Sequence, residues 1–139
     1  MMVPLMAVPF ACLVSASAME VQPRASEAVT VPITIDADHL QVDVTINGEG
    51  PFHFLLDSGA VNVLTPALAK RLALPEGKRI SATGTGGTQQ ATRTKVASVA
   101  IGGVTLTGQD FYVVELPSAA VTGRKIDGLI GHGWLGKIP

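Results

Sequence analysis

Phe52-His53-Phe54-Leu55-Leu56-Asp57-Ser58-Gly59-Ala60 places a single acid directly after an apolar run and follows it with a hydroxyl residue and a glycine. We expect the apolar run to be a strand, with Asp57 at the point where the chain leaves the sheet. The backbone amides of the turn then point toward its carboxylate, which we expect to be half-buried. Asp, Ser and Gly are also favoured in ordinary turns, so the tripeptide alone fits a plain turn as well as a functional acid.

The sequence before this stretch alternates between apolar and polar residues, which is the period of a half-buried strand. Leu40 to Ile46 alternates throughout, and Val29 to Ile35 alternates ahead of it. Asn47-Gly48-Glu49-Gly50-Pro51 consists of residues that turns favour. We therefore expect Leu40 to Ile46 and Phe52 to Leu56 to form a hairpin.

One short helix is expected among the strands that follow. Thr65 suits the N-cap, Pro66 suits the first turn, and Leu68 and Leu72 supply an apolar face, so the helix ends before Pro75. Further strands, separated by glycine turns, are expected over residues 78–83, 92–101, 104–106 and 111–116. The sequence predicts a mostly β domain with one or two short helices.

Length and composition indicate one folded domain. A chain of 139 residues suits a single domain, and 47% hydrophobic with 15% charged residues is too apolar for disorder. Ten Lys plus Arg against eleven Asp plus Glu, with no basic block, argues against nucleic acid as a partner. Cys12 is the only cysteine, and His39, His53 and His132 are widely spaced, which excludes a disulfide framework and a structural zinc site.

The N-terminus has the pattern of an export signal. Val3 to Val14 is apolar and uncharged, and Ser15-Ala16-Ser17-Ala18 supplies the small residues of a cleavage site. The apolar run is too short for a comfortable membrane span. We expect residues 1–18 to be a signal peptide, 19–28 a leader and 29–139 the domain of an exported protein, periplasmic or secreted. No Lys or Arg precedes the apolar run, so an uncleaved membrane anchor and a misassigned start remain alternatives.

Four stretches occur in a characteristic order: Ile46 to Phe52, Leu55-Leu56-Asp57-Ser58-Gly59-Ala60, Thr83-Gly84-Thr85-Gly86-Gly87 and Ile126-Asp127-Gly128-Leu129-Ile130-Gly131. In this order they resemble the retropepsin-like aspartic proteases, in particular the single-domain bacterial relatives of the retroviral enzymes. The resemblance covers about Val29 to Leu135. It implies a closed, mostly β acid-protease barrel and the activity of an aspartic endopeptidase, with no metal or organic cofactor.

The resemblance also implies a two-chain active site. In that family the aspartate that falls on Asp57 faces its symmetry mate from a second chain, and the pair holds a water molecule. Two carboxylates that lie so near each other cannot both ionise easily. One therefore acts as base on the water, while the other donates a proton to the scissile amide. Because this chain carries one such motif, the resemblance implies a homodimer acting on a peptide or protein substrate.

Further roles are carried over from the family by position. Ser58 matches the residue whose hydroxyl braces the two active-site loops, Gly59 allows close backbone approach, and Ala60 matches a small residue. Three glycines match a mobile flap that closes over substrate, with an ordinary hairpin tip as the alternative: Gly84, Gly86 and Gly87. Asp127 is interpreted as a turn or surface acid rather than a second catalytic one.

The sequence also departs from the family pattern. Val61 stands where many relatives have a polar residue, Gly133 stands where relatives often have an acid, and Pro139 ends the chain where the family continues into a terminal strand. We interpret His53 as a surface or interface residue and Trp134 as a core or edge anchor. These departures leave three alternatives open: the chain is a fragment, its dimer forms in another way, or it is inactive. In the last case its function is that of a non-catalytic homodimeric or peptide-binding domain of the same fold.

Overall fold

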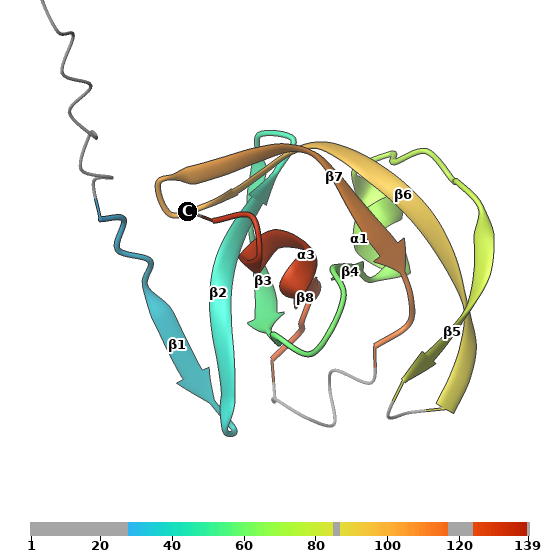
Figure 1. Ribbon diagram of the computed structural model, residues 1–139, viewed down its shortest axis with the longest axis horizontal. Coiled ribbons are helices and arrows are strands. Elements are labelled where there is room, and N and C mark those ends of the chain that lie inside the picture. The colour runs from blue at the N-terminus through green and yellow to red at the C-terminus, as the bar shows by residue number, and fades with distance from the viewer. Residues whose placement is uncertain (1–27, 85–86, 117–123, 139) are drawn as a thin grey trace, which may run out of the picture.

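The computed structural model describes residues 28–84, 87–116 and 124–138 (Figure 1). In chain order the described elements are β1 (Ile33–Asp36), β2 (His39–Ile46), β3 (Glu49–Leu56), β4 (Val63–Leu64), α1 (Pro66–Arg71), β5 (Arg79–Gly84), β6 (Gly87–Ile101), β7 (Val104–Val113), β8 (Gly128–Ile130) and α3 (His132–Leu135). The expected signal peptide, its cleavage site, Cys12 and Gly86 lie outside the described residues.

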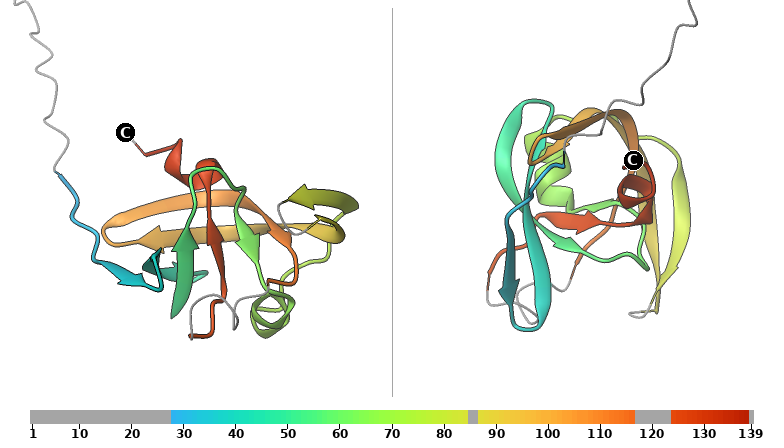
Figure 2. Two further views of the ribbon diagram at one scale, coloured as in Figure 1. Left: turned by 90° about the horizontal axis from the view of Figure 1, so that it is seen from below. Right: turned by 60° about the vertical axis from the view of Figure 1, so that its left-hand side comes forward.

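The strands form one sheet that curls into a ring, as the two views in Figure 2 show. Its strand order is β1-β2-β3-β8-β4-β7-β6-β5. An additional antiparallel pairing of Thr45 with Ala100 and Ile46 with Val99 joins β2 to β6 and closes the ring. The 15-residue β6 makes this closure possible because its first part pairs with β5, its second part pairs with β7, and Val99 and Ala100 in that second part also pair with β2.

The interior of the ring is filled by apolar side chains. Phe54 of β3, Phe111 of β7 and Ile130 of β8 are fully buried. Burying each phenylalanine contributes about 1.5–3 kcal/mol to stability. Trp134 of α3 is 2% exposed and belongs to the same cluster, which confirms its interpretation as a core anchor.

The expected hairpin is present as β2 and β3. Asn47 and Gly48 form its turn with φ values of 51° and 81°, the left-handed conformations that a tight hairpin requires. The Asn47 side-chain oxygen also accepts a hydrogen bond from the backbone N–H of Ser98 at 3.0 Å, which attaches the turn to β6. The second strand begins at Glu49, earlier than the expected Phe52, because the turn itself needs only two residues.

The expectation of a half-buried strand from Val29 to Ile35 is wrong. Only Ile33–Asp36 forms a strand, and Ile33 and Ile35 are 50% and 72% exposed. The physical reason is that β1 is an edge strand, which pairs with β2 alone, and no second layer covers its apolar face.

The helix prediction is confirmed. α1 begins at Pro66, and the Thr65 hydroxyl accepts a hydrogen bond from the backbone N–H of Leu68 at 3.3 Å. By contrast, the strands predicted over 104–106 and 111–116 belong to the single strand β7, which ends at Val113, so residues 114–116 are not in a strand. Instead of the glycine turn expected between them, β7 continues through Gly108 with φ 60°, because β6 pairs with β7 on both sides of it.

Candidate active site

The turn that follows β3 holds the candidate acid in a defined position. The backbone N–H of Gly59 donates to Asp57 Oδ1 at 2.9 Å, and the N–H of Ala60 donates to the Asp57 carbonyl oxygen at 3.0 Å. The N–H of Asp57 itself donates to the carbonyl oxygen of Ile130 at 3.0 Å. The expected orientation of turn amides toward the carboxylate is therefore present.

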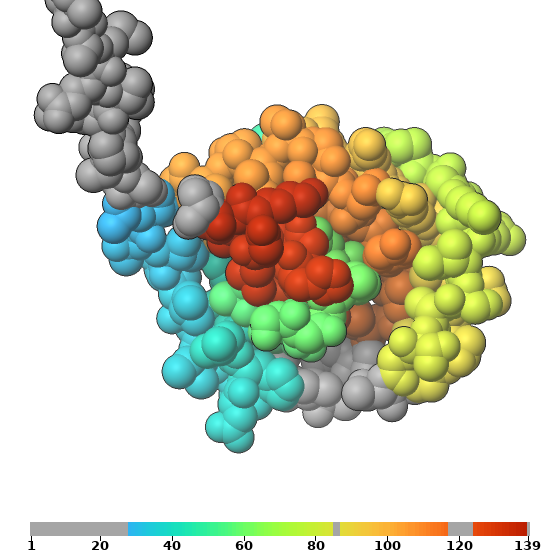
Figure 3. All heavy atoms as spheres, viewed as in Figure 1, coloured from blue at the N-terminus to red at the C-terminus, as the bar shows by residue number. Residues whose placement is uncertain are grey.

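Asp57, Ser58 and Gly59 are exposed in the single chain. Figure 3 shows the segment between β3 and β4 (green) at the surface, directly below α3 (red). The expectation of a half-buried carboxylate is therefore wrong for one chain, because the turn projects beyond the end of β3. The acid is left accessible to a ligand or to another chain.

β8 lies behind this turn and fixes its geometry. It pairs parallel with β3, from Phe54 with Gly128 to Leu56 with Ile130, and antiparallel with β4. The chain that leaves β3 must therefore cross the end of β8 before it enters β4. Gly131 lies so close to this crossing that a Cβ atom would overlap the carbonyl oxygen of Ala60, and only glycine fits. The segment from Gly128 to Gly131 therefore packs directly behind the turn.

Asn62 is a residue of this site that the sequence analysis missed. Its side chain is 3% exposed, its Oδ1 accepts from the backbone N–H of Gly131 at 3.0 Å, and its Nδ2 donates to the Asp110 carbonyl oxygen at 3.4 Å. It therefore connects the turn, the end of β8 and β7. A lone polar residue between Val61 and Val63 was the available signal.

The same region carries an ion pair between strands β6 and β7. Arg93 Nη2 donates to Asp110 Oδ2 at 2.7 Å. The hydrogen bond and charge of Arg93 lower the pKa of Asp110, and the hydrogen bond and charge of Asp110 raise the pKa of Arg93. The two side chains are 54% and 40% exposed, so the pair contributes only modestly to the stability of the fold.

His132 also contacts the turn. Its backbone N–H and its ring Nδ1 both lie within hydrogen-bonding distance of the Ala60 carbonyl oxygen, at 3.0 Å and 2.7 Å. His132 is the first residue of α3. In the sequence, His132 stands out only as one of three widely spaced histidines.

Asp127 lies beside β3 and forms hydrogen bonds with backbone groups. Its Oδ2 accepts from the backbone N–H of His53 at 3.1 Å, its own N–H donates to the His53 carbonyl oxygen at 2.8 Å, and its carbonyl oxygen accepts from Thr65 N–H at 3.0 Å. These bonds agree with a structural acid. The ring Nδ1 of His53 is 2.9 Å from Asp43 Oδ1 on the surface, as expected for a surface histidine.

Of the glycine-rich segment, Gly84 ends β5 and Gly87 begins β6. Gly84 pairs with Gly87, and Gly87 has φ 97° with open space around it. The apolar side chains of Ile80 and Ala82 in β5 pack against a buried cluster of Val63, Ala91 and Val114. Within the described residues, no hydrogen bond or ion pair joins Gly84 or Gly87 to Asp57.

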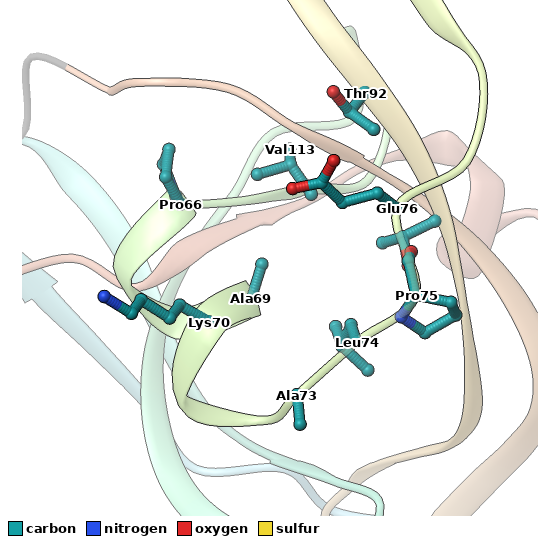
Figure 4. Close-up of a pocket in the computed structure, with 10 residues that line it drawn as sticks. Pro66, Ala69, Lys70, Ala73, Leu74, Pro75, Glu76, Thr92 and Val113 are labelled. Atoms are coloured by element: carbon teal, nitrogen blue, oxygen red, sulfur yellow. The ribbon is translucent and has the colours of Figure 1, made fainter.

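Two cavities flank the ring, and Leu56, the residue before Asp57, lines one of them. One, of about 580 Å³, lies between α1, the segment after it and strands β6 and β7, and its wall includes Ala69, Leu74 and Val113 (Figure 4). The other, of about 590 Å³, is mainly apolar and lies between Val31 and Trp134. Asp57 lines neither cavity, so the candidate site is an open surface on the single chain.

In the part of the chain that the structure describes, no group of three or more His, Cys, Asp or Glu side chains is arranged to hold a metal ion. No helix among these residues is long and apolar enough to cross a membrane.

Comparison with known proteins identifies the family and the fold of the chain. The family model described as aspartyl protease matches residues 42–134. The crystal structure of a retropepsin-like aspartic protease from Rickettsia conorii matches with a TM-score of 0.56 and 20% sequence identity, covering 79% of this chain and 91% of that chain. The comparison with curated proteins gave no match. The solved structure shows a shared fold, so the expected retropepsin-like barrel is confirmed.

Proposed function

Because the chain belongs to the aspartyl protease family, we propose that it is an aspartic endopeptidase in which Asp57 is the catalytic residue. The observation that carries this proposal is the turn itself. Asp57 is exposed, and the N–H of Gly59 orients one oxygen of its carboxylate. Bonds from Ile130 and His132 anchor both ends of the turn to β8 and α3. An accessible carboxylate on a rigid support is what general acid–base catalysis requires.

The proposed active site needs two chains. Hydrolysis of a peptide bond requires a base to take a proton from water and an acid to give one to the carbonyl oxygen. One Asp57 cannot hold both roles at once, whereas a twofold dimer brings two copies together. The water oxygen then attacks the carbonyl carbon. When the resulting tetrahedral intermediate collapses, the C–N bond breaks and the leaving nitrogen takes a proton from the dyad.

Exposed apolar side chains support association with a second copy. Val61, four residues after Asp57, is 41% exposed beside the turn. Around the free edge of β1, Ile33, Ile35 and its cross-strand neighbour Leu40 are exposed as well. Apolar side chains gathered on a surface mark contact sites on soluble proteins.

We further propose that the substrate is a peptide or protein and that the protein is exported, periplasmic or secreted. The support for export is the apolar run and small-residue pattern of residues 1–18. An uncleaved anchor is the alternative for the same segment. Sequencing the N-terminus of the protein recovered from cells separates the two, since cleavage after Ala18 leaves Met19 first.

The rival function is a non-catalytic domain of the same fold that binds a peptide or a second copy. A library of peptides incubated with the purified protein and analysed by mass spectrometry separates the two proposals. We expect cleavage products with the natural sequence and none with Asp57→Asn. Binding of peptides without any cleavage, across pH 3 to 8, would instead support the rival.

A further inference from the structure

Ala60 ends the turn that carries Asp57, and its carbonyl oxygen receives both contacts from His132. The backbone N–H of His132 donates at 3.0 Å, and the ring Nδ1 lies at 2.7 Å. A carbonyl oxygen only accepts hydrogen bonds, so Nδ1 of the ring must carry the hydrogen. His132 is exposed, which means that the ring is held in place by this bond rather than by burial.

The turn is thereby tied at both ends to neighbouring residues of one segment. The N–H of Asp57 donates to Ile130, and the carbonyl oxygen of Ala60 accepts from His132. Gly131 between them leaves no space for a side chain against Ala60. Three hydrogen bonds therefore hold the turn against this segment: one from Asp57 to Ile130, and two from the backbone and the ring of His132 to Ala60. Of these, a side-chain substitution can remove only the bond from the ring.

We propose that His132 is a positioning residue for the hydrolysis proposed above: its ring fixes the Ala60 carbonyl and, through the turn, the direction of the Asp57 carboxylate. This inference rests on the proposed function for its kinetic consequence. Small misplacements of a catalytic group slow the chemical step far more than they weaken binding. Because the ring is exposed and the backbone bond remains, its loss should cost rate and little stability.

Three substitutions separate the ring bond from other roles of His132. The side-chain amide nitrogen of asparagine can occupy the place of Nδ1, whereas that of glutamine reaches the place of Nε2. We expect His132→Ala and His132→Gln to lower kcat about fivefold to tenfold, with KM within twofold and an unchanged melting temperature. His132→Asn should retain most of kcat.

His39 provides a matched control. Its ring Nδ1 lies 2.6 Å from the Ala37 carbonyl oxygen, so it makes the same kind of contact in the β1–β2 turn, and in the part of the chain that the structure describes no hydrogen bond joins it to the turn of Asp57. His39→Ala should leave kcat unchanged. Equal loss of kcat in all three His132 variants, or a loss matched by His39→Ala, would overturn the assignment.

Hydrogen exchange tests the inference without relying on activity. The N–H groups of Gly59 and Ala60 both donate to Asp57, so they report on the order of the turn. Their exchange should be faster in His132→Ala and His132→Gln, and unchanged in His132→Asn. Unchanged exchange in all three would overturn the positioning role, whereas absence of cleavage by the natural protein would overturn only the proposed function.

Discussion

The backbone N–H of Asp57 donates to the carbonyl oxygen of Ile130 at 3.0 Å, so the candidate acid is hydrogen-bonded directly to β8, a strand that comes late in the chain. β8 supplies that carbonyl while it pairs with β3 on one side and β4 on the other. The start of the turn is therefore attached to the sheet. Its properties can be tested by changing the acid, its supports and the surface around it.

Asp57→Asn should lower the rate of peptide cleavage by about a thousandfold or more, because an amide can neither take a proton from water nor return one. The fold should persist, since the asparagine side-chain oxygen can still accept from the N–H of Gly59. Cleavage rate and melting temperature measured together check this. Asp127→Ala is the control: it should lower stability through the lost bond to His53 N–H and spare the chemistry of the folded fraction.

Asn62→Ala should destabilise the protein by about 1–3 kcal/mol, because it leaves the buried N–H of Gly131 without an acceptor. Urea denaturation measures the change in the free energy of unfolding. Val61→Ala changes the exposed neighbouring side chain and should have a much smaller effect. Equal stability of both variants would contradict a supporting role for Asn62.

Gly131→Ala should destabilise the fold by about 1–3 kcal/mol, since the added Cβ would overlap the Ala60 carbonyl oxygen. Gly84→Ala is the matched change on the hairpin, where nothing lies within 4 Å and no left-handed φ is required. We expect thermal unfolding to separate the two substitutions clearly. A neutral Gly131→Ala would mean that the crossing over β8 is looser than described.

Specific activity should fall on dilution, because each half of the proposed dyad comes from a different chain. Sedimentation velocity beside the peptide assay tests this. A strictly monomeric species that cleaves at full specific activity would exclude the two-chain mechanism.

Ile35→Lys should weaken association, since it places a charge on the exposed apolar edge of β1. Thr34→Lys on the same strand is the control, because Thr34 is an exposed polar residue and adds the same charge. The dimer dissociation constant from sedimentation should rise more for Ile35→Lys. Equal effects of both variants would place the association surface elsewhere.

The Arg93–Asp110 pair predicts a pH-dependent difference in stability. Arg93 lowers the pKa of Asp110 below its ordinary value of 3.8, so the stabilisation is fully present above that value and is lost as the pH falls through the lowered pKa. Arg93→Gln should therefore be less stable than the natural protein at pH 7, and the two should converge in strong acid. Urea denaturation of both proteins at several pH values provides the measurement.

The sequence by itself determined the elements whose physics is local. The turn at Asn47 and Gly48, the cap at Thr65 and the polar turn after β3 each depend on residues within a few positions of one another. Turn and capping preferences act at that range, so they can be read from the chain without its fold. The order of the family motifs then indicated Asp57 as the candidate acid.

Only the tertiary structure decided what supports that acid. The place of β8 between β3 and β4, the burial of Asn62 and the contact of His132 with Ala60 join residues that are distant in sequence. The same holds for β1, whose alternation predicted burial but whose edge position leaves it exposed. Alternation indicates that a strand has one apolar face, whereas the neighbours available to cover that face are set by long-range pairing.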